Sequence, residues 1–222
     1  MKPLLLVAAV ALALGLPAAA LAQQPTPAPL ARGDVAGTIG WLSGDKSDLA
    51  NRSTNDWYNR GLYAGAVAGW YWTDHHKTQV EAGLTNSISF WTYRLYTFDT
   101  TQASGGSRFA FTLTRVALGQ HYQFYRNAWV HPHVGVGVDL TRERTIEHAE
   151  PLISYDLITR GPGLLRPAAT IGPTTTLHVR PYAEAGFKAY MTPRAYFRGD
   201  MRVLVRGGID EVLLRCGFGV DF

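Results

Sequence analysis

The sequence predicts an all-β protein: an eight-stranded, antiparallel, up-and-down transmembrane β-barrel preceded by a cleaved signal peptide. Three observations support this prediction. The N-terminus has the form of an export signal, apolar and polar residues then alternate with a period of two through eight segments, and short and long connections alternate between those segments. We expect a signal peptide over residues 1–22, a Pro-rich periplasmic linker over 23–33 and a transmembrane β-barrel domain over 34–222.

The first residues decide the expected compartment. Lys2 precedes an apolar run over residues 4–16, and Ala20-Leu21-Ala22 matches the small-residue pattern of a signal-peptide cleavage site. The alternative, a retained membrane anchor, is disfavoured because the apolar run is shorter than the ~20 residues of a spanning helix. We therefore expect export and cleavage after Ala22. Alternating prolines between residues 23 and 31 predict an extended linker without a core.

Composition narrows the class of protein further. The chain has 222 residues, of which 46% are hydrophobic and 12% aromatic, yet its mean hydropathy is −0.06. A helical membrane protein would be far more apolar. The single cysteine excludes an intramolecular disulfide and a cysteine-based metal site. A formal charge of +4, scattered along the chain, indicates no nucleic-acid partner. A soluble up-and-down barrel of the lipocalin kind remains as an alternative.

Eight segments alternate with the period of a β-strand that has two unlike faces. They lie near residues 35–42, 61–72, 78–92, 110–124, 129–140, 177–191, 195–206 and 211–222. The last is the clearest, because its apolar side chains all share one face: Val212, Leu214, Cys216, Phe218, Val220 and Phe222.

The connections between these segments predict the topology. Short turns are expected at 73–77, 125–127 and 192–194, and a tight loop at 207–210. Longer connections are expected at 43–59, 93–108 and 141–176. Short periplasmic turns and longer external loops are typical of outer-membrane barrels. Tryptophans near the strand ends, at 41, 70 and 72, fit an interfacial girdle.

The inward face predicts a charged lumen. An eight-stranded barrel is only wide enough for its own side chains to fill, and charges in such an interior persist only when they are paired. The residues expected to form this luminal charge network are Glu81, Arg115, Glu184, Lys188, Arg198, Asp200, Arg202, Arg206, Glu211 and Arg215. Asp139, Arg180 and Asp221 share the inward parity. We expect a structural polar plug, and a conducting or gated pore is the alternative.

Turn lengths predict which of these charges face each other. The three-residue turn at Thr192 sets Glu184 opposite Arg202 and Lys188 opposite Arg198. The four-residue turn at Gly207 sets Arg206 opposite Glu211, Arg202 opposite Arg215 and Arg198 opposite Gly219. Arg202 is thereby expected to lie between a carboxylate and a second guanidinium, in a network shared with Asp200.

The histidines invite a metal or catalytic hypothesis. His121, His131 and His133 face inward by parity, and the turn near Tyr125 sets His121 opposite His131. Three imidazoles can bind zinc or copper. With no neighbouring carboxylate or thiolate expected, ordinary luminal hydrogen bonding is favoured, and no metal or other cofactor is predicted. A lipid-modifying enzyme would need serine, histidine and an acid near the outer leaflet, so no catalytic residue is predicted.

Several short motifs carry a resemblance to a known family: Val80-Glu81-Ala82-Gly83, Val134-Gly135-Val136-Gly137-Val138, Arg180-Pro181-Tyr182-Ala183-Glu184-Ala185-Gly186 and the terminal Phe222. The chain resembles the small outer-membrane β-barrel superfamily of bacteria, which includes OmpA-, OmpX- and OmpW-like barrels. The resemblance implies a bacterial outer-membrane location, contact with lipid and lipopolysaccharide, and insertion by the β-barrel assembly machinery. That machinery reads the last strand, here through Phe218, Val220 and Phe222. We expect no peptidoglycan-binding domain after Phe222.

Three hypotheses about function follow. The favoured one is a structural or surface-interaction role in which external loops contact partners. The 141–176 connection mixes charges with Leu152, Ile153, Tyr155 and Leu157, which predicts strand extensions above the membrane and a site for an external ligand. The alternative is a narrow passive channel for small, hydrophobic solutes, as the OmpW-like part of the resemblance implies. The third is a lipid-modifying outer-membrane enzyme.

Overall fold

The computed structural model describes residues 32–45, 57–98, 101–124, 129–156 and 162–222. The signal peptide and all but the last two linker residues therefore lie outside the described part. The described residues form ten strands: β1 (Gly33–Asp45), β2 (Trp57–Tyr71), β3 (His76–Phe98), β4 (Thr101–Gln123), β5 (Val130–Ala149), β6 (Leu152–Asp156), β7 (Pro162–Arg166), β8 (Ala169–Tyr190), β9 (Ala195–Val205) and β10 (Ile209–Asp221). The described residues include no helix long and apolar enough to cross a membrane.

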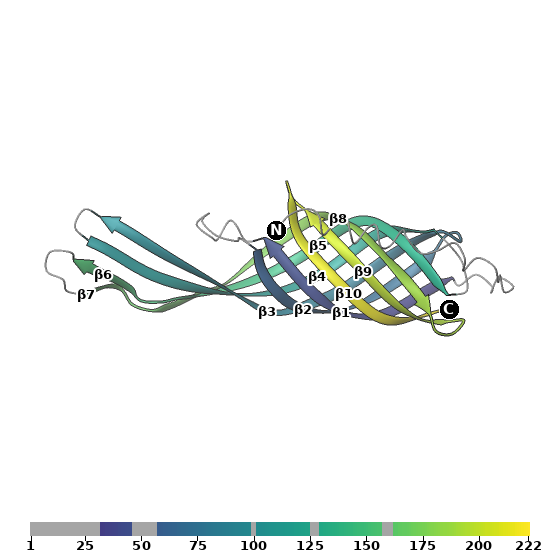
Figure 1. The fold of residues 1–222 in the computed structure, drawn as a ribbon, viewed down its shortest axis with the longest axis horizontal. Coiled ribbons are helices and arrows are strands. Elements are labelled where there is room, and N and C mark those ends of the chain that lie inside the picture. The colour runs from purple at the N-terminus through teal and green to yellow at the C-terminus, as the bar shows by residue number, and fades with distance from the viewer. Residues whose placement is uncertain (1–31, 46–56, 99–100, 125–128, 157–161) are drawn as a thin grey trace.

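Eight of these strands close into a barrel (Figure 1). Each strand pairs antiparallel with its neighbour in the order β1, β2, β3, β4, β5, β8, β9 and β10, and β10 returns to pair with β1. Val35 faces Val220 and Ile39 faces Cys216 at this closing seam. The predicted eight-stranded, up-and-down barrel is confirmed.

The two faces of each strand have opposite chemistry. On β1, Val35, Ile39 and Trp41 point outward and are 44%, 57% and 56% exposed, whereas Asp34 and Thr38 point inward and are buried. A soluble barrel would bury its apolar face and present the polar one to water. This barrel exposes its apolar face and buries its polar one, as a barrel surrounded by hydrocarbon does. The alternative of a soluble, lipocalin-like barrel is therefore wrong. Trp70 and Trp72 are also exposed.

Four strands continue beyond the barrel as a twisted sheet, which extends to the left in Figure 1. Residues 88–98 of β3 pair with 101–111 of β4, and residues 143–149 of β5 pair with 169–176 of β8. The β6–β7 hairpin pairs with the tip of β4. We call these paired segments the external sheet. The 141–176 region was expected to form strand extensions and does. The expectation of a connection at 93–108 is wrong, because β3 and β4 stay paired from Tyr93–Gly106 to Phe98–Thr101.

The interior changes character along the barrel axis. Apolar side chains gather at the end that bears the external sheet, and we call them the apolar cap: Leu42, Tyr63, Phe109, Phe111, Leu113 and Leu213. Buried charged residues occupy the lumen between this cap and the end with the short turns. The external sheet lies at the end of the barrel opposite the short turns, and we expect it to stand outside the cell because short turns face the periplasm in outer-membrane barrels.

Candidate functional site

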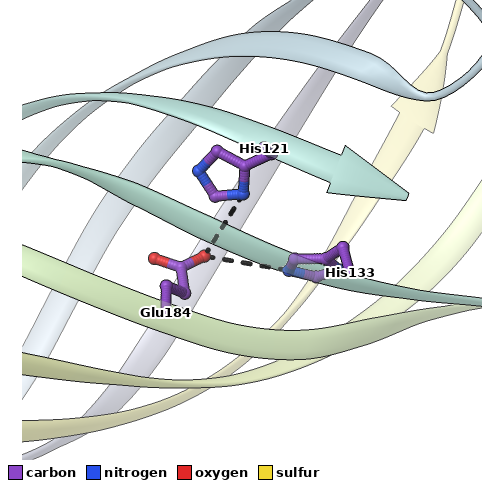
Figure 2. Close-up of side chains that lie close together, drawn as sticks. All are labelled: His121, His133 and Glu184. Atoms are coloured by element: carbon purple, nitrogen blue, oxygen red, sulfur yellow. Dashed lines mark ion pairs between the residues drawn. The ribbon is translucent and has the colours of Figure 1, made fainter. Parts of the chain in front are cut away.

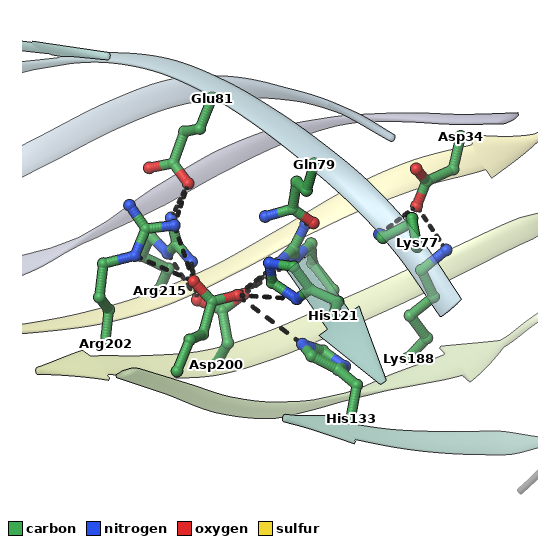
Figure 3. Close-up of polar contacts among 12 residues, drawn as sticks. Asp34, Lys77, Gln79, Glu81, His121, His133, Lys188, Asp200, Arg202 and Arg215 are labelled. Atoms are coloured by element: carbon green, nitrogen blue, oxygen red, sulfur yellow. Dashed lines mark hydrogen bonds and ion pairs between the residues drawn. The ribbon is translucent and has the colours of Figure 1, made fainter. Parts of the chain in front are cut away.

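A dense group of charges fills the middle of the barrel (Figure 3). We call it the central cluster, and its members are Glu81 on β3, Glu184 on β8, Arg198, Asp200 and Arg202 on β9, and Arg215 on β10. All are buried. Each comes from an inward-facing position of its strand, so the period-two pattern alone directs these side chains to the lumen.

Glu184 accepts hydrogen bonds from three guanidinium groups. Arg202 donates to its Oε2 from Nε and Nη2 at 2.9 and 2.7 Å, and Arg215 Nη2 donates to the same oxygen at 2.6 Å. Arg198 Nη2 donates to Oε1 at 3.2 Å. Arg202 and Arg215 also bind Glu81, and Arg215 and Arg198 bind Asp200. The three carboxylates and three guanidiniums therefore compensate each other's charge, as burial requires.

The registers of these charges follow the turns only in part. Glu184 faces Arg202 and Lys188 faces Arg198, as the Thr192 turn predicts. Across the other edge of β9, Arg215 faces Asp200, so the expected Arg202–Arg215 and Arg198–Gly219 pairings are wrong. The reason is that the turn comprises residues 206–208 instead of 207–210 and is followed by a one-residue register irregularity between Ile209 and Glu211. The resulting shift is two residues, which keeps each side chain on its face but gives it a new partner.

Arg206 was expected in the luminal charge network, and the structure places it elsewhere. The same shift places Leu204 opposite Glu211, and Arg206 lies beyond the end of β9 with an exposed side chain. Its Nη1 lies 3.5 Å from Nδ1 of His178. Arg206 therefore belongs to the external rim of the barrel and not to the lumen.

Glu211 instead joins a second group of charges, next to the central cluster on the external side. Arg115 binds Glu211 and lies 3.8 Å from Asp139, while Arg180 lies 3.2 Å from Glu211. Arg180 also donates to Thr141 Oγ1 at 3.1 Å. These contacts connect four strands just inside the apolar cap.

A third group lies toward the short turns and was largely missed in the sequence. Lys188 Nζ lies 2.6 Å from Asp34 Oδ2 and 3.0 Å from Asp221 Oδ1, and Lys77 Nζ donates to Asp34 at 2.9 Å. Lys77 was expected in a turn but is a buried residue of β3, two positions before Gln79 on the inward face. Asp34 and Lys77 each lie one residue before the expected start of their strand, at 35 and 78. Starting each strand one residue earlier would have placed both side chains on the inward face.

Two histidines lie beside the central cluster. His121 on β4 and His133 on β5 point toward Glu184 (Figure 2), with His121 Nδ1 and His133 Nε2 lying 3.9 and 3.8 Å from Glu184 Oε1. One nitrogen of each ring and one carboxylate oxygen lie within 4.8 Å of one another. We call these three residues the His–His–Glu trio. They could hold a metal ion, and the expectation that no carboxylate neighbours the histidines is wrong.

The trio could not be found from turn lengths. His121 faces Gly135 and not His131, and Gly135 in turn faces Glu184 on β8. β5 and β8 are joined through the long external segment, so no turn rule sets their register. His131 lies outside the trio, with its ring centroid 4.6 Å from that of Tyr190.

Of the three residues expected to carry the assembly signal, two lie on the outer face of β10 and the third, Phe222, directly follows the strand. Phe218, Val220 and Phe222 are 62%, 46% and 64% exposed, and the Phe218 ring packs edge-on against Phe197 at 5.4 Å. They thus form part of the lipid-facing surface beside the closing seam.

Known proteins similar to this chain were found among solved structures. No protein-family model and no curated protein sequence matches the chain. Among solved structures, Neisserial surface protein A is similar, with 13% identity, a TM-score of 0.50, and coverage of 86% of this chain and 96% of that chain. Ail, the attachment invasion locus protein of Yersinia pestis, is 10% identical with a TM-score of 0.49, covering 86% and 99%. OprG of Pseudomonas aeruginosa is 12% identical with a TM-score of 0.47, covering 86% and 97%.

The similarity to Neisserial surface protein A shows that the two chains share a β-barrel fold. The apolar exterior, and an interior whose buried arginines and lysines lie beside carboxylates, are what a membrane-spanning barrel requires. The chain therefore has the fold and the apolar outer surface of a membrane-spanning β-barrel.

Proposed function

We propose that the protein is a non-enzymatic surface-interaction barrel, anchored by its membrane-spanning strands and contacting a macromolecular partner through the external sheet. The observation that carries this proposal is a row of exposed side chains on β3. Trp91, Tyr93 and Leu95 alternate along one face of the strand and are 57%, 69% and 61% exposed. They stand in the external sheet, beyond the barrel wall.

The composition of the sheet favours a partner over plain solvent. Aromatic residues are enriched in protein interfaces, where their rigid rings bury much area at a low entropic cost. Tyr155 on β6, Leu164 on β7 and Ile171 on β8 are also 49–66% exposed. Together with the β3 row they give the sheet far more exposed apolar surface than an inert projection needs.

The filled lumen favours the surface-interaction role and disfavours the alternative of a passive channel. Arg115, Arg198 and Arg202 are each at most 1% exposed, and the apolar cap covers the charges on the external side. A channel for small, hydrophobic solutes would have to displace paired charges from a low-dielectric interior, which costs several kcal/mol per unpaired ion.

Two measurements test the proposal. In planar lipid bilayers the purified protein is expected to give no stepwise conductance, because side chains fill the lumen. Cells that display the protein are expected to adhere to one or more immobilised glycoproteins or to purified lipopolysaccharide. A Trp91→Ser/Tyr93→Ser/Leu95→Ser variant should lose that adhesion at least tenfold while keeping its heat-modifiable gel mobility. Stepwise conductance together with unchanged adhesion of the variant would favour the channel alternative.

A further inference from the structure

We propose that the His–His–Glu trio is a binding site for a divalent transition-metal ion of the zinc class, held inside the barrel by His121, His133 and Glu184. The site shares no residue with the external sheet, so a test of metal binding neither supports nor contradicts the proposed surface role.

The imidazoles supply the first argument. His121 and His133 are 2% and 5% exposed, and among the described residues none of their four ring nitrogens makes a hydrogen bond. A buried polar group without a partner costs about 1–3 kcal/mol, and native proteins rarely leave one unexplained. Two such rings aimed at one carboxylate oxygen (Figure 2) are explained if an ion lies between them.

The donor set supplies the second argument. Two imidazole nitrogens and one carboxylate oxygen suit Zn²⁺, Co²⁺, Ni²⁺ or Cu²⁺ and not Ca²⁺ or Mg²⁺, which take oxygen ligands. Ligand atoms around a tetrahedral zinc ion lie about 3.3 Å apart, given bonds of about 2.0 Å. Glu184 Oε1 lies 3.8 and 3.9 Å from the two ring nitrogens, and all three atoms lie within 4.8 Å of one another. The rings must therefore move toward Glu184 and toward each other to reach that geometry.

The surrounding residues orient the carboxylate. Arg202 and Arg215 hold Oε2 of Glu184, which leaves Oε1 turned toward the rings. Arg198 is the one guanidinium in the central cluster that hydrogen-bonds to Oε1, at 3.2 Å, and it also donates to Asp200 Oδ2 at 2.9 Å. Arg198 therefore competes with a bound cation for Oε1. Its hydrogen bond to Glu184 can break while its hydrogen bond to Asp200 remains.

Metal binding is best measured on the metal-stripped, full chain refolded in detergent, with the metal present during refolding so that access to the lumen is not limiting. We expect Co²⁺ to give the d–d absorption of a nitrogen- and oxygen-ligated site at one ion per chain, and Zn²⁺ to displace it. His121→Asn and His133→Gln should each weaken Zn²⁺ binding at least tenfold.

Matched controls separate this site from other histidines. A His75→Gln/His76→Gln variant alters the pair at the short turn, and His131→Gln alters a nearby lumen-facing histidine outside the trio. Both should bind Zn²⁺ like the native protein. Heat-modifiable mobility of every variant shows that its barrel has folded.

The competing role of Arg198 gives a result in the opposite direction. Arg198→Gln removes a cation from Oε1, so it should tighten Zn²⁺ binding severalfold, whereas a loss of the site through distortion would weaken it. The proposal is overturned if the native protein shows no Co²⁺ spectrum, if the His75/His76 variant loses binding, or if Arg198→Gln weakens it.

Discussion

Among single residues, Arg202 contacts several charged groups of the barrel interior and an aromatic ring. It binds Glu184 and Glu81, lies 3.7 Å from Asp139, and its guanidinium carbon sits 4.0 Å from the centroid of the Tyr182 ring. Removing one member of a buried ion network leaves its partners charged without compensation. The cost of such a substitution is therefore dominated by the carboxylates that stay behind.

We expect Arg202→Ala to lower the free energy of unfolding by about 3–5 kcal/mol, because it leaves Glu184 and Glu81 undercompensated in the lumen. The measurement is urea unfolding in lipid vesicles. Arg206→Ala is the matched control, since Arg206 is exposed at the rim, and its effect should stay within about 0.5 kcal/mol. Equal midpoints for the two variants would contradict the assignment of Arg206 to the rim.

Gly135 makes the His–His–Glu trio sterically attainable. It lies between His121 and Glu184 in one row across β4, β5 and β8, and a Cβ there would come within 2.7 Å of the His121 ring. A side chain at this position would have to displace the imidazole.

Gly135→Ala should therefore destabilise the barrel by about 1–3 kcal/mol, the usual cost of overpacking an interior, and should weaken metal binding together with it. Gly37→Ala is the matched control: Gly37 lies on the lipid face of β1, and a Cβ there meets no atom within 4 Å. Urea unfolding compares the two. An unaffected Gly135→Ala variant would show that the His121 ring sits elsewhere.

Among the elements, β10 closes the barrel and is paired on both sides. It pairs with β9 and β1, and the backbone of Phe222 exchanges hydrogen bonds with Gly33 at 2.9 and 3.0 Å. In hydrocarbon, each backbone group left without a partner costs several kcal/mol. The last residues therefore contribute to closure through their backbone, whatever their side chains do.

We expect removal of residues 220–222 to abolish heat-modifiable mobility both in cells and after refolding in detergent. Phe222→Ala keeps the backbone hydrogen bonds, so it should still fold in detergent. If Phe218, Val220 and Phe222 act as the signal for the assembly machinery, as we propose, Phe222→Ala should slow assembly in cells. Normal mobility of the truncated chain would contradict the closing role of β10.

The external sheet is the element that sequence reasoning placed least completely. Its β5–β8 part was anticipated from the apolar residues of the 141–176 segment, but its β3–β4 part was taken for a connection. The 101–107 segment holds glycines and small polar residues and lacks the strict alternation of a barrel strand. It is a strand because β3 supplies a partner at every position from Phe98–Thr101 back to Trp91–Arg108.

The orientation of the external sheet can be tested on intact cells. Added protease should cut within the β6–β7 region and leave the Thr192 turn intact, because only the former projects outward. Permeabilising the outer membrane should then expose the Thr192 turn. Cleavage at Thr192 in intact cells would reverse the assigned orientation.

At the scale of the whole molecule, the apolar exterior and the paired interior make one prediction about location. The protein should fractionate with outer membranes and resist extraction by high salt, because its contact with lipid is apolar and not ionic. Fractionation of cells at native expression, followed by a salt wash, measures this. Recovery in the soluble periplasmic fraction would contradict a membrane-spanning barrel.

The sequence by itself determined the number of barrel strands, their order and the face on which most barrel side chains lie. These properties depend on period-two alternation and on short turns, both of which are local. Glu184 and Arg202 could be paired because three turn residues separate their strands. The same reasoning failed for Arg206 and Arg215. The β9–β10 turn lies at 206–208 instead of 207–210, and a one-residue irregularity follows it, so that together they shift every later pair by two without changing any face.

Only the tertiary structure decided which luminal residues meet. The trio brings together His121, His133 and Glu184 from three strands, and the register between β5 and β8 depends on the closed ring and the long external sheet. Asp34 on β1 and Lys77 on β3 meet over Gly69 of β2, the strand between them, so their contact depends on two registers at once. A period-two pattern specifies the face of a residue, but contacts across a barrel depend on registers summed around the whole ring, which no local pattern contains.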